Sequence, residues 1–343
     1  TIHFCVEFLS FFCTTHQMAE SNSCKDIFPT SHVSYQDFNA KNDTEVHLGT
    51  IVRRLCNSDK RSREWAFETL PEAMNQSFGE FALAESCLCS HPVYHFKGIG
   101  TENVSMSFDF QNWPHALHRQ PEKIKQEIQL LFQIWRSLFY FLYLTDEQDT
   151  QDKFIDTMCK MEEKVLFLRD SGVSIMWTFA AWYYLSIKWA ELDQWRLDKY
   201  LYFARKLFES TVRRHPSSFV IELLKNFYTY PEHTALGMHI IDVFLEGSIL
   251  YPAIPSDKFH ELFTGLFCEN HVALNHKPFQ KRVKKWIIEP IVGNKVVTTD
   301  ILSALPLILE TIRHRIGVAN TSSHLRRVLY EYYQSLDSYV RNE

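Results

Sequence analysis

The chain has 343 residues, of which 45% are hydrophobic and 15% aromatic, so it can bury a large core and is not intrinsically disordered. Only 10 glycines and 12 prolines are present, which disfavours an all-β fold with many tight turns and favours helices. The formal net charge of -5 excludes nucleic-acid binding through bulk positive charge. Any contact with nucleic acid must therefore be local.

The cysteine usage indicates a reducing compartment. Scattered thiols in a long chain fit a cytosolic or nuclear protein better than a disulfide framework. The eight cysteines are Cys5, Cys13, Cys24, Cys56, Cys87, Cys89, Cys159 and Cys268.

The first segment does not resemble a secretion signal. It lacks a basic start and a small-residue cleavage site, and Glu7 interrupts its apolar run. We expect the native protein to begin at Met18 and residues 1–44 to form a flexible or non-native leader. The other long apolar run, residues 173–187, is too short to span a membrane and predicts a buried helix. No membrane contact is expected.

Two short helices joined by a turn are predicted within residues 44–74, with Ser58 or Asp59 as the N-cap of the second. Apolar residues, Trp65 among them, define the expected buried face of that second helix. The periodicity fails between Cys87 and Gln120, where glycines and prolines cluster, so a long loop insertion is expected there.

The clearest helix is predicted from Pro121 to about Leu144, and its wide apolar stripe around Trp135 requires packing on more than one side. An acidic stretch follows, which we interpret as a solvated face. Its acidic residues are Asp146, Glu147, Asp149, Asp152, Asp156, Glu162 and Glu163.

Helical patterns with short links continue to the end of the chain. Residues 173–190 and 192–214 predict an antiparallel pair. The sequence therefore predicts an all-α fold of stacked antiparallel hairpins, an irregular α-solenoid similar to HEAT and armadillo arrays. Further helices are expected over residues 218–228, 235–249, 256–267, 279–288, 300–316 and 322–339.

No sequence signature of an enzyme is present, and no catalytic residue or cofactor is predicted. The nearest candidate pair of carboxylates, Asp193 and Asp198, is spaced to lie on different helix faces. Asp193 and Arg196, three residues apart, are expected to form a local ion pair instead.

One segment has weak metal-binding character. Two thiolates and two imidazoles within nine residues could bind zinc, although the spacing differs from common zinc sites. An incidental loop is the favoured interpretation. The four residues are Cys87, Cys89, His91 and His95.

Basic residues form three local clusters that could follow RNA phosphates, with Trp195 or Trp286 available for stacking on bases. Ordinary solvated faces of amphipathic helices are an equally good interpretation. The candidate RNA-binding or partner-binding residues are Arg53, Arg54, Arg61 and Arg63, then Arg205 and Lys206, then Lys281, Arg282, Lys284 and Lys285.

Four blocks of sequence between residues 46 and 292 resemble the ribosomal RNA-processing protein 1 family, also called novel nuclear protein 1. The most specific block is KWAELDQWRLDKYLYFARKLF; the others are HLGTIVRRLCNSDKRSREWAFETL, IQLLFQIWRSLFYFLYLTDEQDTQDKF and LGMHIIDVFLEGS. The matching signature positions are Trp135, Arg136, Phe139, Tyr140, Asp146, Trp189, Asp193, Arg196, Asp198, Lys199, His239 and Asp242.

This resemblance implies a non-enzymatic helical scaffold of the nucleolus that acts in pre-rRNA processing, mainly for the large subunit. It implies that the signature residues are structural or contact residues. Expected partners are pre-ribosomal particles, assembly factors and pre-rRNA itself, and no DNA. A family-like domain over residues 45–292 and a C-terminal hairpin over 293–343, packed on the same array, are expected. The alternative is an α-solenoid adaptor that binds only proteins.

Overall fold

The structure, a computed structural model, describes residues 48–77, 87–88, 94–97, 103–106, 122–169, 171–229, 234–250, 261–262, 277–293 and 299–342. The chain divides into two compact units, Thr1–Glu45 and Val46–Glu343, and every described residue belongs to the second. The expected leader and most of the helix expected over 256–267 lie outside the described residues.

The first two helices form the predicted helix pair. Helix α2 (Leu48–Arg54) is followed by a turn and by α3 (Lys60–Ser77), and the two helices contact each other. The carboxylate of Asp59 accepts a hydrogen bond from the Ser62 N–H at 2.8 Å, so Asp59 caps α3 as expected. Ile51 and Leu70 are fully buried.

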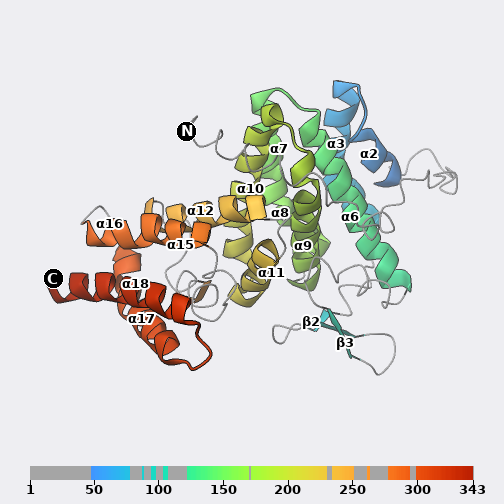
Figure 1. Ribbon diagram of the computed structural model, residues 1–343. Coiled ribbons are helices and arrows are strands. Elements are labelled where there is room, and N and C mark those ends of the chain that lie inside the picture. Colours follow the sequence, from blue (N-terminus) through green and yellow to red (C-terminus); the bar gives the residue numbers. More distant parts are fainter. Residues whose placement is uncertain are drawn as a thin grey trace, which may run out of the picture. The chain divides into compact units, whose positions relative to one another are not determined.

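The segment expected to be a loop contains a small antiparallel sheet. Its strands are β1 (Cys87–Leu88), β2 (Tyr94–Lys97) and β3 (Asn103–Met106), in the order β1-β2-β3. Tyr94 pairs with Met106, and Figure 1 shows β2 and β3 as neighbouring arrows. Strands of two to four residues are too short to produce a readable alternation of apolar and polar positions, which explains why the sequence did not predict them.

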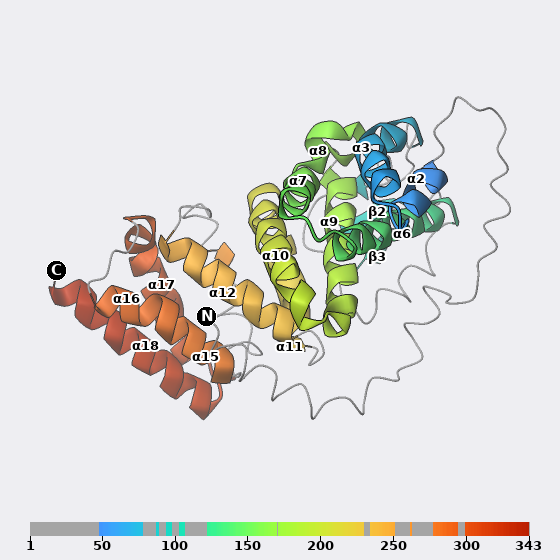
Figure 2. The same ribbon diagram turned by 90° about the horizontal axis from the view of Figure 1, so that it is seen from above.

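Four helices form the centre of the described core: α6 (Glu122–Tyr143), α7 (Gln148–Cys159), α9 (Ser171–Lys188) and α10 (Gln194–Arg214). Helix α6 contacts α9, and α7 contacts α10 (Figure 2). Trp182 and Tyr183 on α9 are almost completely buried, so the apolar run is a core helix as expected. No helix among the described residues is long and apolar enough to cross a membrane.

Helices α9 and α10 are antiparallel, as predicted. Thr178 Oγ1 lies 2.8 Å from Nε2 of His215, and the Trp182 indole N–H donates to Thr211 Oγ1 at 3.1 Å. Later residues of α9 therefore contact earlier residues of α10. These buried polar groups form hydrogen bonds with one another, so their burial carries little free-energy penalty.

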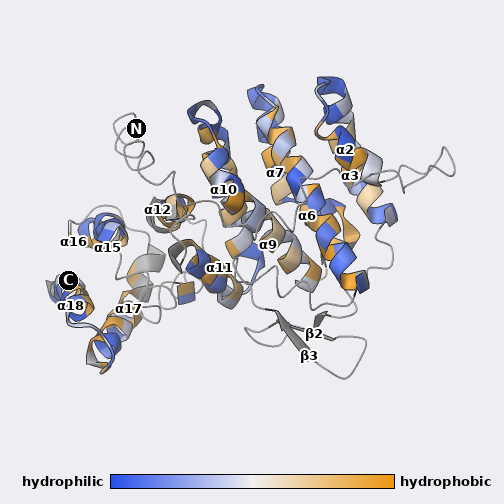
Figure 3. Cartoon of the chain, turned by 45° about the vertical axis from the view of Figure 1, so that its right-hand side comes forward, coloured by the Kyte–Doolittle hydropathy of each residue, from blue (hydrophilic) through white to orange (hydrophobic). Residues whose placement is uncertain are grey.

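The acidic stretch after α6 forms α7, a helix that was not predicted from the sequence. Phe154, Ile155 and Met158 face the core, whereas Asp149 and Asp156 are exposed. The helix is thus hydrophobic on one side and hydrophilic on the other (Figure 3). A short helix α8 (Met161–Lys164), a 3-10 turn η2 (Leu166–Arg169) and a second 3-10 turn η3 (Trp189–Glu191) complete this region.

The array continues through α11 (Ser217–Thr229) and α12 (Thr234–Leu250). These helices approach closely at Gly237, where a Cβ atom would lie 2.5 Å from that of Phe227. The next helix is α15 (Lys277–Val283), which runs through a π-helical turn η6 (Lys284–Ile288) into α16 (Glu289–Val292). Helices α17 (Thr299–Gly317) and α18 (Ser323–Asn342) form the last pair. The predicted all-α architecture of packed helices is confirmed.

Candidate functional site

The most specific sequence block forms a turn and the start of α10. Asp193 is the N-cap of α10: its Oδ1 accepts hydrogen bonds from the backbone N–H groups of Trp195 and Arg196, both at 3.0 Å. Arg196 also forms an ion pair with the Asp193 carboxylate, which confirms the expected local pair. Asp193 therefore fixes both the helix start and the Arg196 side chain.

Two cations from this first part of α10 reach the end of α6. Arg196 Nε donates to the Tyr143 carbonyl at 3.3 Å, and its guanidinium carbon lies 4.1 Å from the Tyr143 ring centroid. Lys199 Nζ donates to the carbonyls of Tyr143 at 3.1 Å and Thr145 at 2.7 Å. The last carbonyls of a helix lack partners within the helix, and cations are favourable there.

A third cation comes from α3. The Arg63 side chain donates to the Leu144 carbonyl at 3.1 Å and to the carbonyls of Asn57 and Ser58 at 2.8 Å each. Arg63 is 7% exposed, so from a buried position on α3 it joins the turn before that helix to the end of α6. We call Arg63, Arg196 and Lys199 the α6 cap, because all three bind carbonyls at the end of that helix.

Lys199 is a second cation of the α6 cap with a largely buried side chain. Its side chain is 7% exposed and lies 3.9 Å from Asp146. Burial lowers the pKa of Lys199 from its ordinary 10.5, and the nearby Asp146 carboxylate opposes that shift. Asp146 itself is exposed, so Lys199 is held mainly by backbone carbonyls.

The aromatic signature residues belong to the core. Trp135 is 3% exposed, and its ring centroid lies 4.6 Å from that of Trp177. Phe139 stacks at 4.7 Å on Tyr200, whose hydroxyl donates to the Phe139 carbonyl at 2.7 Å. Trp189 is also buried. These residues stabilise the helix packing rather than present a surface.

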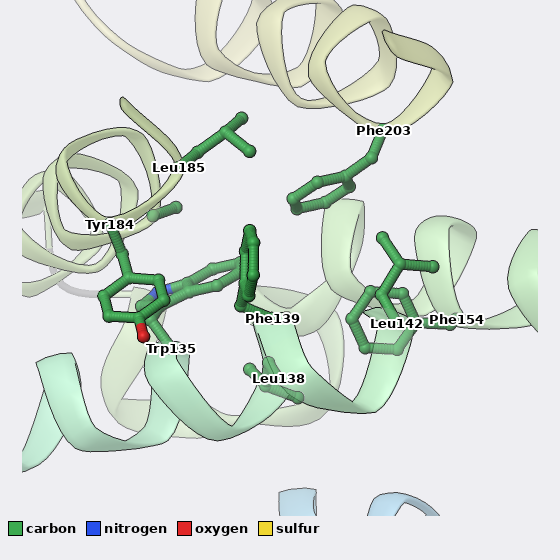
Figure 4. Close-up of a pocket in the computed structure, with 9 residues that line it drawn as sticks. Trp135, Leu138, Phe139, Leu142, Phe154, Tyr184, Leu185 and Phe203 are labelled. Atoms are coloured by element: carbon green, nitrogen blue, oxygen red, sulfur yellow. The ribbon is translucent and has the colours of Figure 1, made fainter. Parts of the chain in front are cut away.

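A small cavity lies among these rings. Its volume is about 10 Å³, and it is lined by apolar side chains that include Trp135, Phe139 and Phe203 (Figure 4). A cavity of that size holds about one water molecule at most, and water needs polar partners. The cavity is therefore a packing gap and not a ligand site.

Other signature residues join α12 to its neighbours or lie at the surface. His239 Nε2 lies 3.0 Å from the Leu201 carbonyl of α10. Asp242 forms an ion pair with Arg282 of α15, with Arg282 Nε 2.9 Å from one carboxylate oxygen and 3.0 Å from the other. Arg136 and Asp198 are exposed, and Tyr140 is half-buried against the edge of the Phe139 ring.

The first basic cluster divides in two. Arg53, Arg54 and Arg61 are exposed, whereas Arg63 belongs to the buried α6 cap. The Arg54 guanidinium carbon lies 4.7 Å from the Trp65 ring centroid. Trp65 is 42% exposed, against the expectation that it lies in the core. The buried row of α3 runs through Ala66, Leu70 and Ala73, and Trp65 falls outside it.

The second basic cluster lies on α10. Arg205 is half-buried, and Lys206 lies 3.6 Å from Glu209 and 5.7 Å from the Tyr202 ring centroid. Trp195, at the start of the same helix, is 85% exposed. An indole this exposed contributes little to packing and is available for stacking.

The third basic cluster lies on α15 and η6. Lys281, Lys284 and Lys285 are exposed around the buried Val283, and Arg282 is engaged with Asp242. π-helical turns such as η6 occur frequently at functional sites. The side chain of Trp286 lies outside the part of the chain whose side chains are described.

Charge is distributed unevenly along the chain. Residues 277–343 contain eleven Lys and Arg against six Asp and Glu. The remaining residues contain twenty-five Lys and Arg against thirty-five Asp and Glu. The helices α15 to α18 thus belong to a basic part of an otherwise acidic chain, which the total charge of -5 conceals.

Two of the four residues of the weak metal candidate lie outside the described residues. Cys87 lies in β1 and His95 in β2, where Leu88 pairs with His95, but Cys89 and His91 are not described. Within the described part of the chain, no group of three or more His, Cys, Asp or Glu side chains could hold a metal ion.

Helices α6 and α10 both lie within a segment of the chain that matches a known protein family. The family described as "Nucleolar protein, Nop52" matches residues 111–304, more than half of the chain. This chain belongs to the Nop52 family of nucleolar proteins. The α6 cap residues Arg196 and Lys199 lie in the matched range, and Arg63 lies before it. The family is nucleolar, in agreement with the nucleolar location expected from the sequence.

A curated relative adds a second likeness. A protein of Dictyostelium discoideum named "Ribosomal RNA processing protein 1 homolog" is 33% identical over 100 residues. The aligned part covers 28% of this chain and 19% of the relative. The alignment therefore spans about a fifth of the relative's length.

Proposed function

We propose that this Nop52 family member is a non-enzymatic scaffold that acts in pre-rRNA processing and in the assembly of mainly the large ribosomal subunit. The similarity to a ribosomal RNA processing protein 1 homolog supports the process. The contacts that the signature residues make within the fold support the scaffold role. Asp193, Arg196 and Lys199 form helix-capping contacts, which is a structural use of these side chains.

The observation that carries a direct RNA contact is the basic excess of residues 277–343. Lys281, Lys284 and Lys285 are exposed on consecutive turns and are suited to phosphate contacts. On α10, Lys206 and the 85% exposed Trp195 provide a second contact, with a cation for the backbone and an indole for a base. We propose pre-rRNA as the ligand of these surfaces within a pre-ribosomal particle.

A protein-only adaptor is the second candidate, and the acidic face of α7 favours it. Asp146 and Glu147 before α7, and Asp149 and Asp156 on it, are all exposed. Such a face would attract basic protein segments and repel phosphates. The two candidate functions predict different results for RNA binding. A scaffold that contacts phosphates should bind RNA with an affinity that falls as the salt concentration rises, whereas a protein-only adaptor should have no specific affinity for RNA.

The test measures binding of the full chain to an rRNA spacer transcript over a series of salt concentrations. Each phosphate contact releases condensed counterions, so the logarithm of the affinity should fall linearly with the logarithm of the salt concentration. Replacing Lys281, Lys284 and Lys285 together by Gln should reduce that slope by about two to three. As a control, Lys160 and Lys164 are replaced together by Gln, because these exposed lysines lie at the two ends of α8.

A wild-type protein that binds the transcript no better than it binds a neutral polymer would contradict direct RNA binding and favour the adaptor. If wild type and the variant with Lys281, Lys284 and Lys285 replaced by Gln show equal salt slopes of RNA binding, the RNA contact lies elsewhere on the chain.

A further inference from the structure

A pocket of about 360 Å³ opens between α3, α6 and α7. Its volume falls within the range of about 300 to 1,000 Å³ typical of small-ligand sites. Phe67 and Phe141 form its apolar part, with ring centroids 4.9 Å apart, and both are nearly buried. Charged side chains and the partly exposed Trp65 complete the lining. None of the signature residues lines this pocket.

One face of α3 contributes a cation, an aromatic ring and a carboxylate to the pocket lining. Arg61, Trp65 and Glu68 are spaced four and three residues apart, so they are neighbours on one face of the helix. They supply a cation, an aromatic plane and a carboxylate in that order. No hydrogen bond or ion pair holds Arg61 among the residues that the structure describes.

The aromatic plane is held in position. The Arg54 guanidinium lies over the Trp65 ring, with its carbon 4.7 Å from the ring centroid. Trp65 remains 42% exposed and contributes to the pocket wall. A fixed indole beside an open space, with a guanidinium four residues before it, suits a stacked base and its phosphate.

The carboxylates set the preference for the base. Glu68 is bound by Lys153 at 2.7 Å, and this hydrogen bond lowers its pKa below the ordinary 4.5, so it is ionised at neutral pH. An ionised carboxylate only accepts hydrogen bonds, and each of its oxygens has further capacity. Glu64 is a second carboxylate in the lining. Guanine presents adjacent N–H donors to such a rim, whereas the two carbonyls of uracil are repelled by it.

We propose that this pocket binds one unstacked nucleotide of single-stranded RNA, preferably guanosine, with its base on Trp65, its edge at Glu64 and Glu68, and its phosphate at Arg61. The inference rests on the proposed function, because it specifies one RNA contact of the same scaffold. It assigns a role to the first basic cluster that does not depend on the surface of α15.

The test uses the full chain and two labelled oligonucleotides: an oligouridine, and the same oligomer with one central guanosine. Wild type should bind the guanosine oligomer more tightly. Trp65→Ala should weaken that binding by about tenfold and remove the preference. Trp65→Phe should retain part of the affinity for the guanosine oligomer, because the phenylalanine ring can still stack on a base. Glu68→Gln should reduce the preference for guanosine. Leu166→Ala, which removes a 61% exposed apolar side chain outside the pocket, should match wild type.

Thermal unfolding of each variant separates binding from folding, and Trp65→Ala should unfold close to wild type because the indole is partly exposed. If Trp65→Ala binds both oligomers as wild type does while the α15 lysine variant loses RNA affinity, the pocket inference is wrong and the proposed function stands. If wild type binds neither these oligomers nor the spacer transcript, direct RNA binding fails as a whole. If Trp65→Ala loses a protein partner but no RNA affinity, the pocket is a peptide site and the inference is overturned.

Discussion

The Lys199 ammonium donates a 2.7 Å hydrogen bond to the carbonyl of Thr145, which lies 54 residues earlier in the chain. With Arg63 on Leu144 and Arg196 on Tyr143, this bond closes the end of α6. Three consecutive carbonyls thus receive cations from two other helices. The family signature on α10 is therefore a structural joint between α6 and α10.

Replacing Lys199 by Met should destabilise the protein by about 2 to 3 kcal/mol, because the bonds to the Tyr143 and Thr145 carbonyls are lost from a nearly buried position. Urea unfolding monitored by circular dichroism measures the change. Lys206→Met on the same helix is the control, since its pair with Glu209 is partly exposed and should matter by less than about 1 kcal/mol. Equal losses for the two variants would mean that the α6 cap is not a stabilising joint.

Trp135→Ala should cost about 3 to 5 kcal/mol, because it removes a 3% exposed indole that packs on Trp177 and Phe203. The urea midpoint and the yield of folded protein should both fall. Trp195→Ala serves as the control: that indole is 85% exposed, so its removal should change stability by less than about 0.5 kcal/mol. An unchanged midpoint for Trp135→Ala would contradict its position in the core.

Asp242 and Arg282 should show coupled effects in a double-mutant cycle, because they bind each other across α12 and α15. We expect an interaction free energy of about 1 kcal/mol from Asp242→Asn, Arg282→Gln and the double variant. Arg282→Gln should also leave the salt slope of RNA binding nearly unchanged, since that guanidinium is already paired. Additive effects of the two substitutions on the free energy of unfolding would contradict this pairing. A salt slope of RNA binding that Arg282→Gln lowers as much as Lys284→Gln does would also contradict it.

Acid should loosen the attachment of α7 to α3. Hydrogen bonds from Lys60 to Glu147 and from Lys153 to Glu68 lower the pKa of each carboxyl below its ordinary 4.5. A lowered carboxyl pKa means stability that is present above the unfolded pKa and lost as the pH falls through the folded one. Replacing Lys60 and Lys153 by Met should therefore flatten the decline of the unfolding free energy below about pH 4.5. Lys160→Met, which removes an exposed lysine at the end of α7, should keep the wild-type profile; an unaltered profile in the double variant would refute this origin.

Local features of the fold were predictable from the sequence, and distant contacts were not. The cap at Asp59 and the Asp193–Arg196 ion pair each join residues three positions apart, so spacing alone predicts them. The Leu144 partner of Arg63 and the Thr145 partner of Lys199 lie more than fifty residues away, and no spacing rule connects them. One signal was available for Arg63: it precedes Ala66 by three residues and Leu70 by seven, which places it on the buried row of α3.

The pocket beside Trp65 was hidden for a similar reason. An apolar side chain near a buried row is usually assigned to the core, and only the packing of α7 against α3 shows that Trp65 faces open space. The basic excess of residues 277–343 could have been found by counting charge along the chain, because it needs no structure.

Gradient sedimentation of the tagged full chain from cell lysate shows whether this Nop52 family member works within pre-ribosomal particles by contacting RNA. RNA that purifies with the protein is sequenced from each fraction. We expect migration with large-subunit precursors, enrichment of spacer RNA, and loss of that RNA from the variant in which Lys281, Lys284 and Lys285 are replaced by Gln. Migration as a free or purely protein-bound species, with no rRNA above background, would contradict it.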